Sequence, residues 1–242
     1  MNQYISIADA LKYAQLQMGA EAFVRQDGTL LNEGSDYLKV LTDGNNHASK
    51  FTSTQAEAFA AEWEVVDQKE NTNTGFSGTL FKKKDGSEYV ISFRSTEFLD
   101  DAARDNQATN QMEIAKYGFA FGQLRDMEDW YAGLRQPGGP LGPTASVDVT
   151  GYSLGGHLAT AFNLLHQGDG NLGRVVTFNG AGIGRWAEGS SLQSLLADFK
   201  RLSRNTSGNE HVFASDQLTA IYQRTRASVA GEAANSTWKL QA

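Results

Sequence analysis

Residues 147–159 read Val-Asp-Val-Thr-Gly-Tyr-Ser-Leu-Gly-Gly-His-Leu-Ala. The apolar residues at their start predict a short strand over 146–149, and the apolar spacing over 155–166 predicts a helix. Between the two lies a Gly-x-Ser-x-Gly pattern, formed by Gly151, Ser153 and Gly155. A strand, this pattern and a helix in that order indicate a sharp turn that lifts a serine hydroxyl above the edge of a sheet.

The glycines have a steric explanation in such a turn, because they let the strand and helix backbones approach closely. The start of the helix presents free N–H groups and a positive dipole end near Ser153. We therefore predict that the Leu154 N–H is an oxyanion-hole donor, aimed at charge that develops on a substrate oxygen. The alternative is a glycine-rich turn with an incidental serine. A phosphate-binding loop would need Lys-Ser or Lys-Thr after its last glycine, and the segment has neither.

Patterns elsewhere predict a single three-layer α/β domain, residues 1–242, with a mostly parallel central sheet. A helical segment at 1–60 precedes a sheet core at 61–242. Helical spacing or capping signals mark residues 7–18 (with Ser6 as N-cap), 36–41, 54–63 (with a capping box at 54–57), 111–134 and 192–202. Strand patterns mark 64–67, 76–82, 87–93, 174–178 and 211–214, and the apolar segment 89–93 is expected to be central.

Composition excludes several classes of function. The net charge of −7 argues against nucleic-acid binding, and Lys82-Lys83-Lys84 beside Asp85-Gly86 is interpreted as a solvated hairpin tip. The chain has no cysteine, so thiol nucleophiles, thiolate metal sites and disulfides are excluded. No spaced His, Asp and Glu set predicts a metal, no cofactor is expected, and no apolar run predicts a transmembrane segment. An acidic cluster is interpreted as a solvated loop, with a lid or a cation site as alternatives; it comprises Asp100, Asp101 and Asp105.

Three ordered motifs resemble those of class 3-type lipases. The first is Gly-Tyr-Ser-Leu-Gly-Gly-His-Leu-Ala at 151–159. Upstream, Ile-Ser-Phe-Arg-Ser-Thr-Glu at 91–97 looks like the strand-end oxyanion motif of that family, and residues 175–184 look like its strand and loop after the nucleophile helix. The resemblance covers roughly residues 60–220. It is greatest to bacterial secreted lipases that often carry calcium-binding repeat tails and leave the cell without an N-terminal signal.

The resemblance implies an α/β-hydrolase that cleaves carboxylic esters, such as lipids, with a Ser-His-Asp triad. Ser153 would be the nucleophile, and Leu154 and Thr96 would stabilise the oxyanion. The sequence departs from the family at Tyr152, where histidine is usual, and at Ser95, where glycine is usual. Four apolar side chains are interpreted either as acyl-chain contacts or as core residues: Trp130, Tyr131, Ile183 and Trp186.

The triad order in this fold is Ser, acid, His. The acid is expected after the strand at 211–214, where Asp216 is the candidate and a loop or N-cap carboxylate is the alternative interpretation. None of residues 217–242 is histidine, which leaves His211 as a candidate base on the unexpected side of the acid. His157 is interpreted as a packing or hydrogen-bonding residue and His166 as a helix cap. We expect a longer parent protein to supply the base.

Two other functions remain open at this point. The chain can be a catalytically silent module of the same fold that binds a lipid or polymer, or an acyltransferase that uses the same serine. Residues 1–7 lack a basic start followed by an apolar stretch, so they do not predict a signal peptide. We expect secretion by a route that needs no such peptide, with a cytoplasmic location as the alternative. The sequence leaves the oligomeric state undetermined.

Overall fold

The computed structural model describes residues 5–45, 48–72, 74–86, 88–95, 114 and 120–181, without the side chain of Phe121. Within these ranges lies a five-stranded sheet of order β3-β4-β5-β6-β7. Its strands are β3 (Trp63–Lys69), β4 (Gly78–Lys83), β5 (Tyr89–Phe93), β6 (Val147–Tyr152) and β7 (Leu172–Phe178). Two short strands, β1 (Arg25–Gln26) and β2 (Thr29–Leu30), pair separately.

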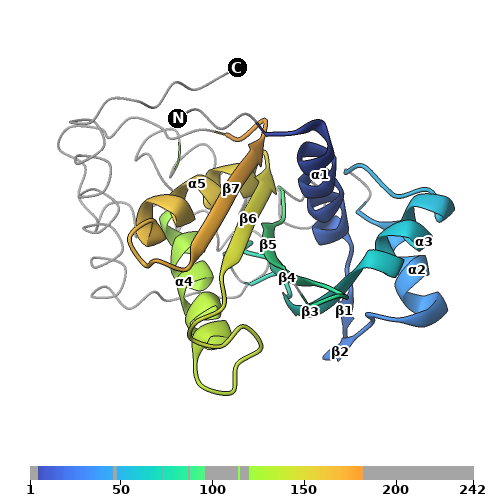
Figure 1. Ribbon diagram of the computed structural model, residues 1–242, viewed down its shortest axis with the longest axis horizontal. Helices are drawn as coiled ribbons and strands as arrows, with labels where there is room; N and C mark the ends of the chain where they lie inside the picture. The colour runs from blue at the N-terminus through green and yellow to red at the C-terminus, as the bar shows by residue number, and fades with distance from the viewer. Residues whose placement is uncertain are drawn as a thin grey trace, which may run out of the picture.

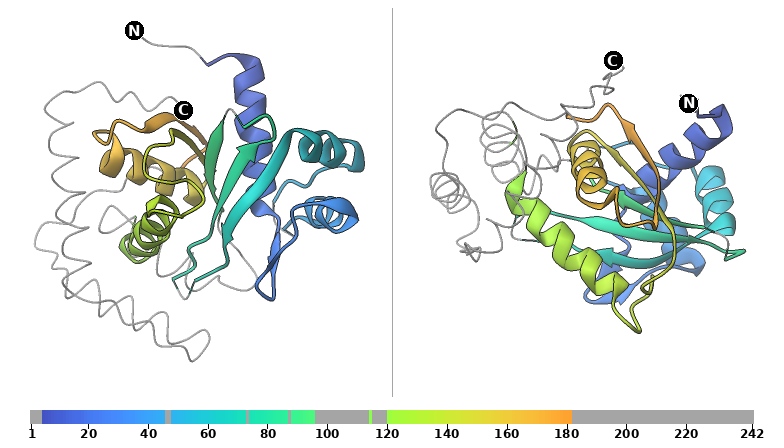
Figure 2. Two further views of the ribbon diagram at one scale, coloured as in Figure 1. Left: turned by 60° about the horizontal axis from the view of Figure 1, so that its bottom comes forward. Right: turned by 60° about the vertical axis from the view of Figure 1, so that its left-hand side comes forward.

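Helices cover both faces of the sheet (Figure 1). They are α1 (Ile7–Glu21), α2 (Gly34–Asp43), α3 (Ser53–Glu62), α4 (Phe121–Arg135) and α5 (Leu154–His166). Two further views show α4 and α5 together on one side and α1 with α2 and α3 on the other (Figure 2). The α/β fold with a helical N-terminal segment is therefore confirmed, and it has three layers.

The direction of the strands changes in the middle of the sheet. The pairings of β3 with β4 and of β4 with β5 are antiparallel, whereas β5 with β6 and β6 with β7 are parallel. β5 is the middle strand, as its apolar sequence predicted. Because β5, β6 and β7 run in one direction, their carboxyl ends meet at one edge, which is where ligands bind in open α/β sheets.

Alternation along the strands divides the apolar residues between two cores. In β5, Val90 faces the core shared with α1, α2 and α3, and Ile91 and Phe93 face the core shared with α4 and α5. In β6, Val147 and Val149 belong to the second of these cores. The sheet is therefore buried on both faces along its middle, as the apolar strand sequences require.

The predicted ends of the helices are partly confirmed. The Ser6 side chain accepts a hydrogen bond from the Asp9 amide and caps α1, as expected. The capping box before α3 lies two residues earlier than predicted: Thr52 and Gln55 form it, so the helix begins at Ser53. α4 ends at Arg135, before the proline cluster, as predicted, and its described part begins at Phe121.

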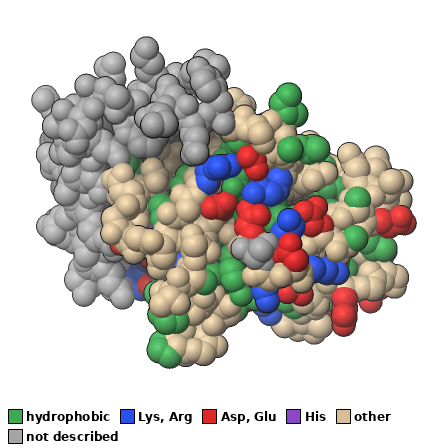
Figure 3. Space-filling view, viewed as in Figure 1, with side chains coloured by type: hydrophobic (Ala, Val, Ile, Leu, Met, Phe, Trp, Pro, Cys, Tyr) green, Lys and Arg blue, Asp and Glu red, His purple; other side chains and the backbone are tan. Residues whose placement is uncertain are grey.

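The lysine run lies at the β4–β5 hairpin, as predicted. Gly86 has a φ of 79°, and the Gly86 amide donates to the Lys83 carbonyl. Two of the lysines lie near acidic side chains: Lys82 near Glu64 at 3.9 Å, and Lys83 near Glu62 at 3.5 Å. Acidic and basic side chains are also intermixed on the face shown in Figure 3.

Several sequence predictions lie outside the described residues. These are the helix at 192–202, the strand at 211–214 and the acidic cluster at 100–105. Over the described part of the chain, no helix has the length and apolar character needed to cross a membrane.

Candidate active site

Ser153 lies between the end of β6 and the first residue of α5. Its backbone has φ 53° and ψ −117°, a conformation that non-glycine residues rarely adopt. Strain of this kind costs on the order of 1–3 kcal/mol and persists only where the surroundings enforce it. The predicted strand and helix are thus joined by a sharp turn at the serine, as expected for a nucleophile elbow.

The elbow depends on close backbone contacts. A Cβ atom at Gly151 would lie 2.2 Å from the Gly155 carbonyl oxygen, and one at Gly155 would lie 2.2 Å from the Phe93 carbonyl oxygen. Real Cβ atoms essentially never come this close to such atoms, so any side chain here would force the backbone apart. Gly151 and Gly155 are therefore required by the packing of β6 and β5 against α5.

A third glycine contact was not predicted from the sequence. A Cβ atom at Gly156 would lie 2.7 Å from the Cα atom of Gly180, in the segment after β7. Before it, Asn179 has a φ of 46°, a second non-glycine residue in the left-handed region near the elbow. The two consecutive glycines at 155–156 were the sequence signal for a close contact. That Gly180 is the residue contacted depends on how β7 pairs with β6.

Hydrogen bonds hold Ser153 from two sides. Its amide donates to the Phe178 carbonyl at 3.1 Å, and its carbonyl accepts from the Ala181 amide at 2.9 Å and from the His157 amide at 3.1 Å. The neighbouring strand and the first turn of α5 therefore both fix the backbone of the serine. Its side chain is neither fully buried nor fully exposed.

The start of α5 provides polar donors beside Ser153. Leu154 is its first residue, and the first amides of a helix have no carbonyl partner within that helix. These amides and the helix dipole favour negative charge at this end. The Leu154 side chain is buried and belongs to the core with α4 and α5. The position of Leu154 suits the predicted oxyanion donor, whose role stays a prediction.

The end of β5 carries the second predicted oxyanion motif. Arg94 and Ser95 follow the strand and are described, whereas Thr96 lies outside the described residues. Arg94 is 4% exposed, and its guanidinium donates to the carbonyls of Ala20 and Ala22. The Ser95 amide donates to the carboxylate of Glu21 at 3.0 Å. Sequence reasoning missed this support, for which an arginine after an apolar strand was the only signal.

The two remaining triad candidates, Asp216 and His211, lie outside the described residues. His157 is fully buried in the first turn of α5, and its Nε2 accepts a hydrogen bond from the Ala120 amide at 3.1 Å. This contact confirms the interpretation of His157 as a packing and hydrogen-bonding residue.

His166, at the end of α5, forms a separate cluster with two carboxylates. Its Nδ1 lies 2.6 Å from Asp169 Oδ2, and its Nε2 lies 2.7 Å from Glu128 Oε1. Burial lowers the pKa of His166, but the hydrogen bonds and charges of Glu128 and Asp169 outweigh burial and raise it. Both ring nitrogens are engaged at the far end of α5 from Ser153, so His166 is an ion-paired structural residue.

Two of the proposed acyl-chain contacts belong to the core. Trp130 and Tyr131 are 8% and 6% exposed, and the Trp130 indole donates to Asp67. Their core interpretation is thus the one supported; Ile183 and Trp186 lie outside the described residues. Tyr152, next to the serine, is 41% exposed. Among the described side chains, no three of His, Asp and Glu are grouped so that they could hold a metal ion.

No protein-family model matches the chain, and no curated protein matches its sequence. Solved structures of fungal lipases resemble it distantly. The Lip2 lipase of Yarrowia lipolytica is 15% identical, with a TM-score of 0.44 and coverage of 88% of this chain and 70% of the lipase. Lipase II of Rhizopus niveus is also 15% identical, with a TM-score of 0.42 and coverage of 82% of this chain and 69% of the lipase.

A fungal lipase solved in complex with an inhibitor is 13% identical, with a TM-score of 0.40 and coverage of 70% of this chain. This chain spans only 60% of that lipase. Because these TM-scores are all below 0.5, we base the proposed function on the geometry around Ser153.

Proposed function

We propose that this protein is a serine-dependent hydrolase of carboxylic esters, of the lipase or esterase type. The observation that carries the proposal is the backbone of Ser153, with φ 53° and ψ −117° at the end of a parallel strand and directly before a helix. Strained backbone of this kind concentrates at functional sites, where it serves the mechanism. The strained serine stands between a strand and a helix, which is the position of the serine in a nucleophile elbow.

In the proposed reaction, the Ser153 hydroxyl oxygen attacks the ester carbonyl carbon and its proton passes to a histidine. The carbonyl oxygen becomes an oxyanion, which the Leu154 amide and Thr96 stabilise. Collapse of this intermediate releases the alcohol, protonated by the histidine, and leaves an acyl-serine that water then hydrolyses. Asp216 orients the histidine and stabilises its charged form.

The identity of the base is a separate part of the proposal. The proposed base is a histidine supplied by a longer parent protein, and His211 is the alternative within this chain. His157 and His166 are engaged by the Ala120 amide and by the two carboxylates, respectively. A His211→Ala variant separates the two candidates, because it removes the activity of this chain only if His211 is the base.

A fluorophosphonate probe tests the nucleophile, because it phosphonylates an activated serine. Intact-protein and peptide mass spectrometry should find one adduct on Ser153, and Ser153→Ala should abolish it. Ser146→Ala is the matched control, since Ser146 is an exposed serine just before the same strand. Labelling that survives in Ser153→Ala would refute the proposal. So would the absence of labelling in both this chain and a longer, histidine-containing protein, the outcome expected of a silent binding module.

The substrate and the location are proposed on the motif resemblance alone. We propose a lipid or another carboxylic ester as substrate and a location outside the cell, as in the bacterial secreted lipases that the motifs resemble. Turnover of p-nitrophenyl esters of increasing chain length would define the acyl preference. Addition of an alcohol acceptor would distinguish hydrolysis from acyl transfer, because a transferase would form the new ester in preference to the free acid.

A further inference from the structure

We propose that Glu21 is a positioning residue that holds the end of β5 against the nucleophile elbow. The inference rests on the proposed function, because the held segment, Arg94-Ser95, leads directly into Thr96, the second predicted oxyanion donor. Glu21 is the last residue of α1 and reaches the strand end across the interface between helix and sheet.

The carboxylate of Glu21 is fully buried and surrounded by donors. Oε1 accepts from the Ser95 amide at 3.0 Å and from Gln17 Nε2 at 2.5 Å, and Oε2 accepts from Asn45 Nδ2 at 3.4 Å. Burial raises the pKa of Glu21 above its usual value, and this effect outweighs the charge of Arg94 and the hydrogen bonds from Ser95 and Asn45, which act to lower it. These contacts offset part of the cost of a carboxylate in the interior.

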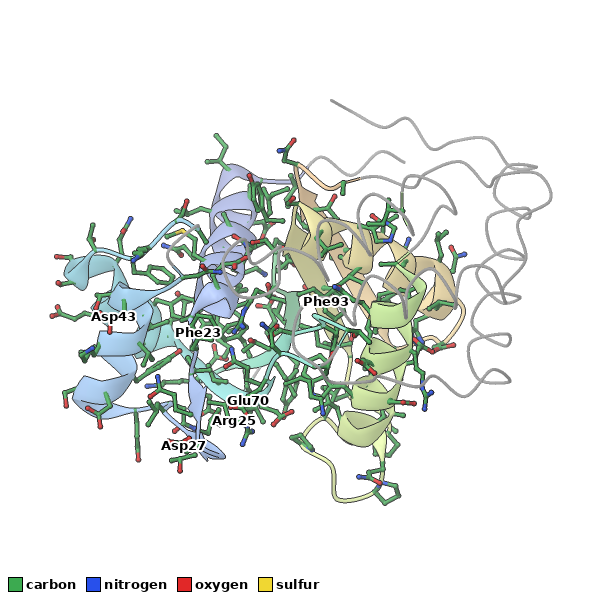
Figure 4. The ribbon with its side chains drawn as sticks, turned by 180° about the vertical axis from the view of Figure 1, so that it is seen from behind. Phe23, Arg25, Asp27, Asp43, Glu70 and Phe93 are labelled. Atoms are coloured by element: carbon green, nitrogen blue, oxygen red, sulfur yellow. The ribbon has the colours of Figure 1, made fainter. Side chains whose placement is uncertain are left out.

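Arg94, which follows β5, also binds the end of α1. Its Nε donates to the Ala20 carbonyl at 3.1 Å and its Nη2 to the Ala22 carbonyl at 3.2 Å, and its guanidinium lies 4.4 Å from the centre of the Phe23 ring. Phe23, just after α1, and Phe93, at the end of β5, are labelled in Figure 4 and mark the two segments that Arg94 joins. The carbonyls at the end of a helix need such partners.

The end of β5 that Glu21 and Arg94 hold also contacts the elbow at Gly155. A Cβ atom at Gly155 would lie 2.2 Å from the Phe93 carbonyl oxygen and 2.8 Å from that of Arg94. The first turn of α5 therefore packs directly on the backbone that Glu21 and Arg94 hold. Any shift of Ser95 away from Glu21 moves the described strand end to which Thr96 is bonded, and oxyanion donors act only when their geometry is accurate.

A buried carboxyl group at this place is poorly explained by stability alone. Well-packed apolar residues often replace buried ion pairs without loss of stability. A carboxylate, however, accepts hydrogen bonds from several directions and so fixes the backbone amide of Ser95 in one place. This is the property that an oxyanion loop requires.

The test compares Glu21→Gln with Asp67→Asn as the matched control. Asp67 also accepts from an arginine and another donor, Arg25 Nη2 at 2.5 Å and Trp130 Nε1 at 2.7 Å, but it lies on the edge strand β3. Two quantities are measured on the whole chain: the second-order rate of fluorophosphonate labelling at Ser153, and the hydrogen exchange of the Ser95 amide. Where the protein turns over an ester, kcat and KM are measured separately.

We expect Glu21→Gln to slow labelling about tenfold, less than the direct loss of an oxyanion donor. Exchange at Ser95 should become faster, and kcat should fall with KM little changed, because an oxyanion contact acts in the transition state. Asp67→Asn should label at about the wild-type rate. If Glu21→Gln does not fold, Arg94→Lys serves instead: it keeps the charge but loses the paired hydrogen bonds to the carbonyls of Ala20 and Ala22, and the same changes are expected.

The possible failures are distinct. If Glu21→Gln labels at the wild-type rate and its Ser95 amide exchanges at the wild-type rate, the inference is overturned and the proposed function stays intact. Equal slowing in Asp67→Asn would show a general effect of destabilisation and would also overturn the inference. A wild-type Ser153 that never labels would refute the proposed function, and the positioning role would fall with it.

Discussion

Ser153 is held in its conformation by its neighbours and not by its own preference. The amides and carbonyls around it come from β7, α5 and the segment after β7, and the glycines on either side leave no room for a side chain. Backbone strain at a serine is thus sustained by tertiary contacts, as expected where strain serves function.

Gly155→Ala should be strongly destabilising, since its methyl group would lie 2.2 Å from the Phe93 carbonyl oxygen. We expect a loss of about 3 kcal/mol or more in the free energy of unfolding, measured by urea denaturation. Gly133→Ala in α4 is the control, because nothing lies within 4 Å of a Cβ atom there. That variant should gain roughly 0.5–1 kcal/mol from helix propensity. Equal effects of the two substitutions would contradict the packing explanation.

The contact between α4 and α5 combines apolar packing with an ion-paired histidine. The Tyr131 ring lies 4.8 Å and the Phe162 ring 4.4 Å from the ring of His166, measured between ring centres. Glu128 comes from α4 and Asp169 from just after α5, so the imidazolium links the two helices. The cluster should therefore make the packing of the two helices dependent on pH.

Because the pKa of His166 is raised above 6.5, the folded state binds a proton more tightly than the unfolded state. The stability from this pairing is fully present below about pH 6.5 and is lost as pH rises through the raised value. The free energy of unfolding of His166→Gln should not show this decrease with rising pH. Urea unfolding between about pH 6 and pH 9 tests this, because the slope of the free energy of unfolding against pH should differ between wild type and variant. Parallel pH profiles would exclude the role of His166.

Two separate apolar cores lie on the two faces of one sheet. α1 is packed on the sheet through buried residues such as Tyr13 and Leu16, and the Tyr13 hydroxyl donates to Asp148 of β6. The helical N-terminal segment therefore contributes to the same structure as the strands that carry the elbow.

We expect residues 1–60 and the sheet to unfold as one cooperative unit, as the proposed single domain requires. Leu16→Ala, at a fully buried position of α1, should lower the free energy of unfolding by about 2–5 kcal/mol. Circular dichroism and tryptophan fluorescence should then report the same shifted midpoint. Loss of helix signal at a lower urea concentration than the loss of fluorescence signal would mean that the segment unfolds separately.

Local patterns in the sequence were sufficient for most of the described elements. The apolar spacing of α1 and α5, the hairpin at Asp85-Gly86 and the central position of β5 depend on neighbouring residues and were predicted correctly. The turn at Ser153 was predicted for the same reason, because glycine spacing around a strand-to-helix turn is a local requirement, whereas the role of Ser153 as nucleophile stays a prediction. The capping box was predicted two residues too late because Thr52 with Gln55 and Thr54 with Glu57 both satisfy the same local rule.

Contacts between distant segments could not be predicted from local patterns in the sequence. Nothing near Glu21 in the sequence indicates that its carboxylate meets the Ser95 amide, and nothing near Gly156 indicates that it packs on Gly180. The local periodicity of the sequence therefore determined its elements, and the glycine spacing around Ser153 determined its candidate nucleophile. Packing of those elements set the strain at Ser153 and the support of the β5 end, since both arise from backbone groups brought together across the sheet.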